Sequence, residues 1–599
     1  MCGIAAHFNS LAPVAPLDLG LIAHRGPDAT GEWTSADQRY WLGNTRLAIL
    51  DLSPTGAQPM IDPVTGNVIV VNGEIYNHRD LRAKLGKVDW RGTSDTETLL
   101  IGYARWGRQL VDRLKGMFAL AIYDHARQEL FVARDRLGIK PLYYTSRDGS
   151  FRLASEVKVI ADPASSITPS SIAAYLQWGA CPEDKILFPE VQVLPAGHSM
   201  VIGHEGKPEI SRYWPAKVPF QSSAEGAPQK IRALLETAVE EHLLSDVPVA
   251  SFLSGGIDSS IVTALAAQKL GRKLETFSVG FDVAGFDESA IALEVAQRYG
   301  SKHQRLQLSE VEVIKSVTEA VAHLDLPSVD AINTYIISRA VARCGVKVAL
   351  SGLGGDELFG GYPSFRDVPR LKLLAKVPRA LRKALAGERL GDLPNELDIG
   401  RLTQWRRRFF TDDMLKRAGL PNETTASPEA PELPDDFARI SWSELTGYMR
   451  RMLLRDSDQM SMGVSLELRV PFLDHELVEY TLGLPAAEKQ RYGEGKGLLV
   501  EACRDLLPPS VYERPKAGFA LPMKEWMAGP LLSFVDVGLR EILERELLPE
   551  SFVSDARDRF RAGRLHWTRL WSMVVLGHFV RRTQAAPRPD ENIALHTFA

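Results

Sequence analysis

The stretch at residues 252–260 limits the fold of this chain more than any other part of the sequence. It reads Phe-Leu-Ser-Gly-Gly-Ile-Asp-Ser-Ser, after an apolar run that starts at residue 247 and before a helix-forming run at residues 261–267. A short apolar run of this kind predicts a buried strand. The glycines let the backbone approach a phosphate, and the helix N-terminus supplies free N–H groups with a positive dipole. Strand, glycine-rich turn and helix together predict a phosphate cradle.

The side chains of this turn suit a nucleotide that carries a magnesium ion. Ser254, Ser259 and Ser260 add hydroxyl donors, and the carboxylate of Asp258 can hold magnesium against the phosphates. No lysine follows the glycines, so this is not the G-x-x-x-x-G-K-[ST] nucleotide loop. The pattern S-G-G-x-D-S-S instead resembles the pyrophosphate loop of enzymes that adenylate a substrate. The alternative is an ordinary glycine–serine turn at the end of a strand.

Length and composition indicate a globular protein with more than one domain. The chain has 599 residues, of which 45% are hydrophobic and 24% charged, and its net charge is −4. This charge gives no preference for nucleic acid, and no apolar run approaches the ~20 residues of a membrane helix. Four cysteines and the absence of a signal-peptide pattern favour a reducing compartment. We therefore expect a cytoplasmic protein that binds small molecules, with no nucleic acid or membrane partner and a homodimer left open.

The N-terminus carries a candidate nucleophile. The chain begins Met1-Cys2-Gly3, and removal of Met1 would give Cys2 a free α-amine. An unperturbed α-amine has a pKa of roughly 7.7–8.0, so it can act as a base near neutral pH. A thiol beside its own amine is a nucleophile with a built-in base. The alternative is a buried structural cysteine, which is the commoner role.

Three further segments carry matching chemistry. Residues 46–50 alternate as a half-buried strand that begins with Arg46. The strand at residues 68–71 ends in Asn72-Gly73, a pair that can present a side-chain amide and a backbone N–H to one point, as in an oxyanion hole. Residues 94–97 open an apolar helix, where Ser94 or Asp95 is alternatively a simple N-cap.

In this order the motifs resemble the class II glutamine amidotransferase domain, and residues 24–28, 116–119 and 134–138 extend the match. The resemblance implies that Cys2 attacks the carboxamide of glutamine and releases glutamate and ammonia, while Asn72 and Gly73 hold the oxyanion. Arg46 would pair with the glutamine carboxylate, and Glu74 and Asp95 would hold its α-amine. The implied glutamine pocket consists of Arg46, Leu47, Ala48, Ile49, Leu50, Asn72, Gly73, Glu74 and Asp95.

Strands alternate with helices in the second half of the chain, which predicts a parallel sheet. Residues 274–281 and 346–350 are further strands, and the glycine-rich residues 351–357 follow the latter. Ligands of such sheets bind at the carboxyl ends of the strands. Asp356 is placed there to share magnesium with Asp258. The predicted ATP-binding residues are Phe252, Ser254, Gly255, Gly256, Asp258, Ser259, Val279, Ser351 and Gly352.

Two such domains in this order resemble the glutamine-hydrolysing asparagine synthetases, and residues 466–474 and 493–496 match further motifs. The resemblance implies ATP and Mg²⁺ as cofactors and places Lys496 over the phosphates, where its charge would act in catalysis; the alternative is a solvated loop lysine. It implies an α+β, Ntn-hydrolase-like domain of stacked antiparallel sheets flanked by helices, then an α/β domain with a parallel sheet, like the adenine-nucleotide α-hydrolases. The expected boundaries are residues 2–214 and 229–583, with a linker at 215–228 and a flexible tail at 584–599.

The implied reaction adenylates a carboxylate and forms an amide from ammonia that crosses an apolar internal passage. Aspartate is the expected acceptor, but Leu353 stands where the best-known members of the family have a glutamate, a candidate base. Either Glu357 or Asp330 does this work, or the acceptor is another carboxylate, such as a uronic-acid sugar or a peptide side chain. A β-lactam-forming relative and a non-catalytic sensor are the other hypotheses. Residues 366–408 are expected to be a solvated basic surface and residues 421–434 a flexible acidic insertion.

Overall fold

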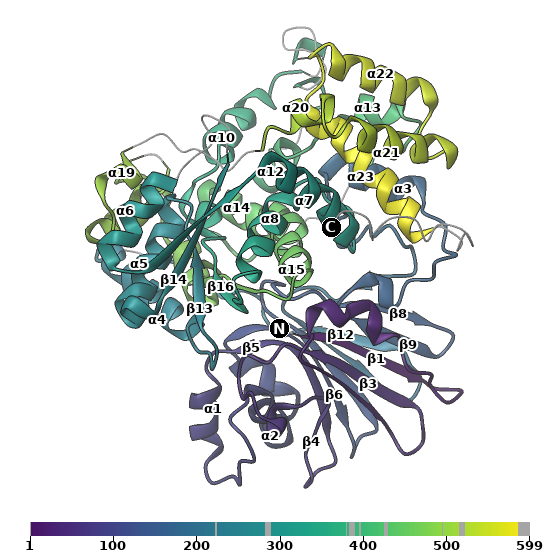
Figure 1. Cartoon of the computed structure of the whole chain (residues 1–599), viewed down its shortest axis with the longest axis vertical. Coiled ribbons are helices and arrows are strands. Elements are labelled where there is room, and N and C mark those ends of the chain that lie inside the picture. The colour runs from purple at the N-terminus through teal and green to yellow at the C-terminus, as the bar shows by residue number, and fades with distance from the viewer. Residues whose placement is uncertain are drawn as a thin grey trace.

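The computed structural model describes residues 2–221, 225–281, 289–378, 380–382, 390–394, 397–423, 429–493, 495–513 and 521–584. The chain forms two lobes (Figure 1). Antiparallel strands such as β1, β3 and β6 make up the lower lobe, and the parallel strands β13, β14 and β16 lie in the upper lobe among helices. This arrangement confirms the predicted fold class for both halves of the chain.

The N-terminal lobe contains two six-stranded antiparallel sheets. In sheet order, the first contains β10 (Gln192–Val193), β8 (Tyr143–Arg147), β9 (Ser150–Ala154), β1 (Gly3–Asn9), β3 (Tyr40–Arg46) and β2 (Ala29–Thr34). The second contains β12 (Pro208–Arg212), β11 (His198–Ile202), β7 (Glu129–Arg134), β6 (Gly116–Asp124), β5 (Val68–Ile75) and β4 (Met60–Ile61).

The two sheets are stacked because each presents an apolar face to the other. Ile4 and Phe8 of β1 share one buried cluster with Val68 and Val70 of β5. The alternate residues of β5 point outward and pack on helix α2 (Asp95–Trp106), which lies beside α1 (His78–Leu85). Helix α3 (Pro169–Trp178) packs on the first sheet. The lobe thus consists of two sheets with helices outside.

The C-terminal lobe is built on a five-stranded parallel sheet. Its order is β15 (Lys302–Leu308), β14 (Glu275–Phe281), β13 (Val249–Phe252), β16 (Val348–Leu350) and β17 (Glu467–Arg469). The predicted strands before the two glycine-rich turns are β13 and β16, and they are neighbours in register. Because both run in the same direction, their carboxyl ends bring residues 254–259 and 351–357 to one edge of the sheet.

Helices surround this sheet and form the rest of the lobe. Those nearest the strands are α4 (Ala227–His242), α5 (Ile257–Leu270), α6 (Ser289–Tyr299), α7 (Glu310–His323), α8 (Ile332–Ala342), α9 (Gly355–Phe359) and α18 (Gly497–Cys503). The others are α10 (Ser364–Leu374), α12 (Ile399–Arg406), α13 (Asp412–Arg417), α14 (Asp436–Glu444), α15 (Arg455–Met462), α16 (His475–Gly483), α17 (Ala486–Gln490), α19 (Pro509–Tyr512), α20 (Met523–Ala528), α21 (Leu532–Glu544), α22 (Glu550–Arg561) and α23 (Trp567–Thr583).

One helical segment has an unusual geometry. Residues Leu445–Leu454, between α14 and α15, form a π-helix of ten residues. Most π-helical segments are single-turn bulges, and they occur frequently at functional sites. Within the described ranges, no helix is both long enough and apolar enough to cross a membrane.

The segment expected to be a linker is partly ordered against the synthetase lobe. The backbone N–H of Lys217 donates to Glu479, and that of Gln221 donates to the carbonyl of Gly483 at 3.2 Å. Helix α4 begins at Ala227, inside the predicted linker, so the linker is shorter than expected at its C-terminal end. Residues 222–224 lie outside the described residues.

The basic segment at residues 366–408 is only in part the solvated surface that we expected. Leu371 and Trp405 belong to an apolar cluster, and Arg407 pairs with the buried Glu444 at 2.9 Å. The expectation failed because charge alone does not reveal that α10, α12 and α14 pack together. Residues 379, 383–389 and 395–396 lie outside the described residues, as do 424–428 of the predicted acidic insertion and 585–599 of the predicted tail.

Buried charges join the two lobes. Arg25 is fully buried, and its guanidinium contacts Glu156 at 2.9 Å and Asp458 of α15 at 2.7 Å. Arg469 of β17, also fully buried, pairs with Glu467 at 2.5 Å and lies 3.6 Å from Glu74 of β5. A buried charge is destabilising unless it is paired, so these contacts hold the lobes in one relative position.

We predict that Arg469→Ala destabilises the protein by about 3–5 kcal/mol, because it leaves Glu467 and Glu74 buried without their cation. Thermal unfolding followed by circular dichroism measures this loss as a lower midpoint temperature of the first unfolding transition. Arg504→Ala is the matched control, since its pair with Glu501 lies on the surface and its removal should not move the transition. An unchanged transition in Arg469→Ala would contradict the role of this pair in joining the lobes.

Candidate active sites

Cys2 lies at the junction of three motifs that are distant in the sequence. Its side chain is 7% exposed at the start of β1. Its backbone N–H donates to Oδ1 of Asn72 at 3.3 Å, and its carbonyl accepts from Nε of Arg25 at 3.2 Å. The segments 2–4, 24–28 and 72–77, which were predicted to act together, therefore meet around the thiol.

The Asn72-Gly73 pair has the features that an oxyanion hole requires. Nδ2 of Asn72 is buried and has no hydrogen-bond partner in the part of the chain that the structure describes. A Cβ atom at position 73 would lie 2.1 Å from the carbonyl oxygen of Met117, so only glycine fits there. A buried donor without a partner is destabilising, and the oxyanion of a reacting glutamine would satisfy it. The oxyanion role itself stays a prediction.

The thiol of Cys2 has an environment that the sequence did not reveal. Burial raises the pKa of the Cys2 thiol, while hydrogen bonds from the backbone of Leu47 and the side chain of Asn44 act in the opposite direction. A thiol with a raised pKa needs a base, which supports the use of the α-amine for this purpose. Asn44 was not predicted. It lies two positions before Arg46 in β3, so the alternation of the strand could have placed it on the same face.

The residues predicted to bind glutamine differ in what their side chains contact. The guanidinium of Arg46 donates to the backbone oxygens of Leu50 and Ser53, at 3.4 and 3.2 Å, and to that of Asp51. Arg46 thus orders the loop that follows it. Ala48 is held through its N–H by Asp28 at 2.7 Å, while Leu47 and Ile49 are buried in an apolar cluster shared by both lobes.

Glu74 lies near the end of β5, and Asp95, the first residue of α2, reaches the same strand end. Asp95 accepts a hydrogen bond from the N–H of Ile75 at 2.9 Å, and burial raises its pKa to about 6. The N-cap of α2 is Ser94, which accepts from the N–H of Glu97, so Asp95 is free of the capping role. Burial, with the charge of Glu467, raises the pKa of Glu74. Two carboxyls at one place suit an ammonium group, although binding of the glutamine amine stays a prediction.

The glycine-rich turn after β13 is ordered by its own serines. The N–H of Ser254 donates to Oγ of Ser259 at 3.2 Å, and the two hydroxyls are 3.0 Å apart. Gly255 has a φ of +76°, which glycine adopts without strain. Helix α5 begins at Ile257, so Asp258 lies in its first turn. The predicted strand, turn and helix are therefore all present.

Lys496 joins the two predicted magnesium ligands. Its Nζ lies 2.6 Å from Oδ1 of Asp356 and also contacts Oδ2 of Asp258. Lys496 is 7% exposed, which contradicts the alternative of a solvated loop lysine. Burial by itself lowers the pKa of Lys496, but the two carboxylates outweigh it and raise the pKa above its usual value. The structure thus brings together three residues spread over more than two hundred positions.

Glycines close this cluster on two sides. A Cβ atom at Gly355 would lie 2.5 Å from Asp258, and one at Gly361 would lie 1.8 Å from Asp356. A Cβ at Gly352 would lie 2.9 Å from Asp258, so the two predicted turns touch each other. Ser351 is held through its N–H by the carbonyl of Arg469 at 2.8 Å. Phe252 and Val279 lie on the adjacent strands β13 and β14.

The chemistry of the donors fits a magnesium ion shared with phosphates. Asp258 and Asp356 offer hard carboxylate oxygens, and together they now hold one cationic group, the Lys496 ammonium. Two carboxylates so close together are stable only with positive charge between them. The described residues contain no group of three or more His, Cys, Asp and Glu that could hold a metal by themselves. The magnesium would therefore need phosphate oxygens as additional ligands, and its binding stays a prediction.

A second group of polar side chains lies beside this site. We call it the tyrosine–arginine cluster: Asp330, Glu357, Tyr362, Arg407 and Tyr448. The hydroxyl of Tyr362 donates to Oε1 of Glu357 at 2.8 Å, and that of Tyr448 donates to Oδ2 of Asp330 at 3.2 Å. The Arg407 guanidinium lies over both rings, at 4.3 and 4.0 Å from their centroids.

The two carboxyls of the tyrosine–arginine cluster hold protons more strongly than usual. Burial, with the neighbouring charge of Asp356, raises the pKa of Glu357 to about 8. Burial raises the pKa of Asp330 to about 6. Glu357 is 1% exposed, and its Oε2 has no hydrogen-bond partner among the described residues. The sequence pointed to both carboxyls, but it gave no signal for Tyr362, Arg407 or Tyr448.

Comparison with known proteins identifies the class of this protein. The family model described as a glutamine amidotransferase domain matches residues 1–214, and the model described as asparagine synthase matches residues 230–581. The chain is thus a glutamine-dependent ligase with two domains. Since the second match alone spans more than half of its length, the chain belongs to the asparagine synthase family.

Curated relatives share nearly the whole chain. A Mycobacterium bovis protein, provisionally named a glutamine-hydrolysing asparagine synthetase, is 34% identical over 93% of this chain and 91% of its own length. Asparagine synthetase 1 of Bacillus subtilis is 31% identical over 96% of both chains. Amidase chry2 of Gibberella zeae is 30% identical over 89% of this chain and 90% of its own. Relatives of similar identity therefore carry different activity names.

We predict that Asn44→Ala slows glutamine hydrolysis by roughly 2- to 13-fold, because Nδ2 of Asn44 donates to the carbonyl of Gly3 at 3.4 Å and one such hydrogen bond contributes about 0.5–1.5 kcal/mol. The side chain of Asn44 lowers the pKa of the Cys2 thiol, so its loss raises that pKa further and moves the rising limb of the pH profile to higher pH. Glutamate release measured between neutral and alkaline pH tests both effects. Asn67→Ala, at a buried asparagine that caps the β6–β7 turn, is the control and should leave the profile in place. An unshifted profile in Asn44→Ala would refute the contact.

Proposed function

We propose that this enzyme transfers the amide nitrogen of glutamine to a carboxylate that it activates with ATP. Cys2 releases ammonia from glutamine, leaving glutamate after hydrolysis of the thioester. A carboxylate oxygen of the acceptor attacks the α-phosphorus of ATP and displaces pyrophosphate. Ammonia then attacks the acyl carbon, AMP leaves, and one proton is lost from nitrogen. The observation that carries this proposal is Lys496, held between Asp258 and Asp356 above two glycine-rich turns.

In the amidotransferase half, the α-amine of Cys2 takes the thiol proton and the sulfur attacks the carboxamide carbon. The free Nδ2 of Asn72 and the N–H of Gly73 would receive the oxyanion. Arg46, Glu74 and Asp95 would hold the charged end of glutamine, together with the backbone of residues 47–50. Hydrolysis of the thioester returns Cys2 to its starting state.

In the synthetase half, the hydroxyls of Ser254 and Ser259 and the N-terminus of α5 would bind the pyrophosphate portion of ATP. Phosphate oxygens would draw Lys496 away from the aspartates, which frees their oxygens. Asp258 and Asp356 are the residues that would hold magnesium, which would supply positive charge against the phosphates. Lys496 stays near the phosphates and stabilises negative charge as it develops.

The passage of ammonia is proposed to follow the apolar contact between the lobes. Leu47, Ile49, Met117 and Ile139 of the first lobe are buried in the same cluster as residues of the second. Ammonia must avoid protonation by bulk water, because ammonium has no lone pair with which to attack. An apolar route through this contact would satisfy that need.

We propose Glu357 as the base that replaces the glutamate missing at position 353. Leu353 packs on the apolar cluster and cannot take a proton. Glu357 is buried next to Asp356 and is held by Tyr362, and its Oε2 has no hydrogen-bond partner in the described part of the chain. Its raised pKa suits a group that accepts a proton from nitrogen. Asp330, the other candidate, lies at the far side of Arg407 in the tyrosine–arginine cluster.

Aspartate is the acceptor that we favour, since the other synthetase motifs are intact and the B. subtilis relative is named an asparagine synthetase. The alternative is a different carboxylate, such as a uronic-acid sugar or a peptide side chain. The fungal relatives named as amidases support it, as does the leucine at position 353. All the residues predicted for the glutamine site are present, which argues against a β-lactam-forming enzyme and against a non-catalytic sensor.

The remaining assignments follow from composition and the domain matches. We assign residues 2–214 to the amidotransferase domain, 215–228 to the linker and 229–583 to the synthetase domain. The end of β12 at Arg212 supports the first boundary, whereas α4 begins at Ala227, inside the proposed linker. A cytoplasmic location is inferred from the cysteines, since Cys2, Cys181, Cys344 and Cys503 are all free.

We predict that Cys2→Ala abolishes amide formation from glutamine but retains it with added ammonia, because only the nitrogen source is lost. Purified protein is incubated with ATP, magnesium and a panel that includes aspartate, a uronic acid and a glutamyl peptide, and pyrophosphate and the new amide are followed. Asp258→Asn is the complementary variant, in which glutamine hydrolysis persists and pyrophosphate release stops. Loss of both nitrogen sources in Cys2→Ala would count against the scheme, and amide formation from only one acid identifies the acceptor.

We predict that Glu357→Gln lowers the rate of amide formation by about 10²–10⁴-fold. With hydroxylamine, which stays neutral across this pH range, the wild-type rate should rise with pH through about 8, because Glu357 must lose its proton to act as a base. The variant should lack this rising limb while still releasing pyrophosphate. Glu501→Gln, at an exposed glutamate, should behave as wild type. A rising limb that survives in Glu357→Gln would exclude this residue as the base.

A further inference from the structure

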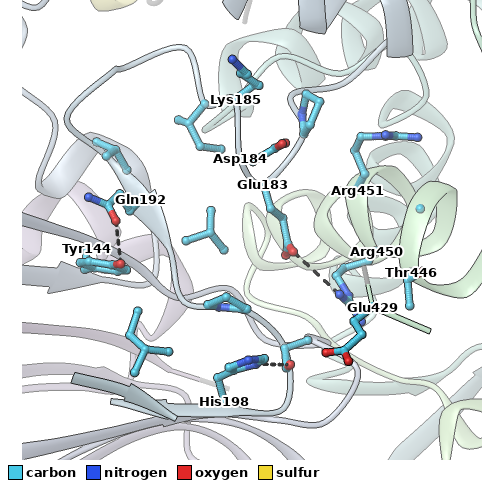
Figure 2. A pocket seen from close by; sticks show the side chains of 18 of the residues that line it. Tyr144, Glu183, Asp184, Lys185, Gln192, His198, Glu429, Thr446, Arg450 and Arg451 are labelled. Atoms are coloured by element: carbon cyan, nitrogen blue, oxygen red, sulfur yellow. Dashed lines mark hydrogen bonds and ion pairs between the residues drawn. The ribbon is translucent and has the colours of Figure 1, made fainter. Parts of the chain in front are cut away.

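A cavity of about 860 Å³ lies between the two lobes, away from both candidate active sites. Figure 2 shows Tyr144 and His198 on strands of the first lobe, facing Thr446, Arg450 and Arg451 on a helix of the second. The facing helix is the π-helix Leu445–Leu454. None of the residues that we assign to the two active sites lines this cavity. Its volume is within the range of small-molecule binding sites.

One end of the cavity is strongly cationic. A small recess of about 20 Å³ continues from it and shares Glu183, Arg450 and Arg451 with it. The recess is lined in addition by Arg134 and Arg455, so four guanidinium groups surround one carboxylate. That carboxylate, Glu183, is already occupied by Arg134 at 2.8 Å and lies 4.0 Å from Arg450, toward which it points in Figure 2.

The other charged groups of the cavity do not balance these arginines. Arg212 and Lys185 also line the cavity and pair with Glu429 at 2.9 Å and Glu423 at 3.3 Å. Asp184 lines the cavity too; burial and the charge of Arg455 lower the pKa of Arg451, and the charge of Asp184 raises it. His198 hydrogen-bonds to the carbonyl of Ala196. The positive charge at the recess is therefore only partly compensated within the described residues.

Arg455 has donors without an acceptor, and Arg451 is destabilised by its surroundings. Nε and Nη2 of Arg455 are buried and have no hydrogen-bond partner among the described residues, while Nη1 donates to the carbonyl of Cys181 at 2.8 Å. Arg451 is 8% exposed and donates to the amide oxygen of Gln404 at 3.1 Å. Burial, with the charge of Arg455, lowers the pKa of Arg451 to about 10. An anion at the opening of the recess would offset this repulsion, and its charge would act on both arginines.

Apolar side chains line the rest of the cavity. Trp214 and Trp442 come from the two lobes, and Ile186, Phe188 and Val191 come from the segment between α3 and β10. Arginines line one end of the cavity and apolar side chains line the rest, so the cavity suits a molecule with an anionic group and an apolar body. Arginine, with its planar fork of donors, is suited to carboxylate and phosphate groups.

We propose that this cavity binds an organic anion, a carboxylate or phosphate ester with an apolar body, as an effector of the synthetase. The acid group would lie in the cavity beside Arg450 and Arg451, at the opening of the recess, and the body would lie against Trp214 and Trp442. The π-helix connects the cavity to the synthetase site, because it carries Arg450 and Arg451 toward the cavity and Tyr448 onto Asp330. A ligand that contacts both lobes and this helix can change the tyrosine–arginine cluster without touching a reactant.

The test uses the full-length protein with phenyl phosphate and phenylacetate as probes and neutral phenylacetamide as the control. Binding is followed through tryptophan fluorescence, since Trp214 and Trp442 line the cavity, and by calorimetry. We expect saturable binding of the anions and none of the amide. Arg451→Met should weaken binding at least tenfold, whereas Arg439→Met, at an exposed arginine of α14, should leave it unchanged. Equal binding of phenylacetamide, or of the anions to Arg451→Met, would overturn the proposal, as would no saturable binding of either anion.

Two further measurements separate an effector site from the alternatives. Thermal unfolding of Arg451→Met should occur at the wild-type temperature or above it, because a buried charge with incomplete compensation is removed; a lower temperature would indicate a structural arginine instead.

Saturating ATP and glutamine should leave the affinity for phenylacetate within a few-fold of its value without them. Competition by either would assign the cavity to a reactant, and a raised KM for the acceptor alone in Arg451→Met would make it an acceptor subsite; both results contradict an effector. The outcome does not depend on which acceptor the enzyme uses.

Discussion

A single buried arginine, Arg469, fixes how the two lobes meet. It is the last residue of β17, and its side chain is fully buried. Nη1 donates to the carbonyls of His242 and Leu244 at 2.7 Å, which ties the end of α4 to the edge of the parallel sheet. The same guanidinium faces Glu74, two residues after Asn72 in β5. Because a buried guanidinium needs these partners, β5 of one lobe and the edge strand β17 of the other cannot move independently.

Arg25 is a second buried arginine that joins the two lobes, and it contacts Cys2. It binds the carbonyl of Cys2 and the carboxylate of Asp458, which also faces Lys140 at 3.5 Å. Asp458 lies on α15, directly after the π-helix. Cys2 is therefore connected through Arg25 to α15, which continues from the π-helix that carries Tyr448. This chain of contacts joins the surroundings of Cys2 to the tyrosine–arginine cluster.

The synthetase site balances its charges before any nucleotide is present. Asp258 and Asp356 are kept together by Lys496, and glycines at positions 355 and 361 leave room for no other side chain. Beside them, Glu357 and Asp330 are buried carboxyls whose pKa values are raised to about 8 and about 6, and Arg407 lies over the two tyrosines that bind them. One region thus contains two carboxylates held by a lysine and two carboxyls whose pKa values burial has raised.

The sequence by itself determined the elements whose chemistry is local. The strand, turn and helix around Ser254 and Asp258, the position of Cys2, the pair Asn72-Gly73 and the parallel order of the second half all follow from short patterns of hydrophobicity, glycine and charge. Tertiary structure alone decided the contacts between distant residues. Lys496 and Asp258 are 238 positions apart, and Arg25 and Asp458 are 433 apart. Such partners meet only when strands and helices pack, so no local pattern in the sequence predicts their contact. For the same reason only the fold revealed the position of Asn44, the contact of Arg407 with two tyrosines, the π-helix and the cationic recess. Burial lowers the local dielectric, so each of these charges interacts more strongly with its partners than it would in water.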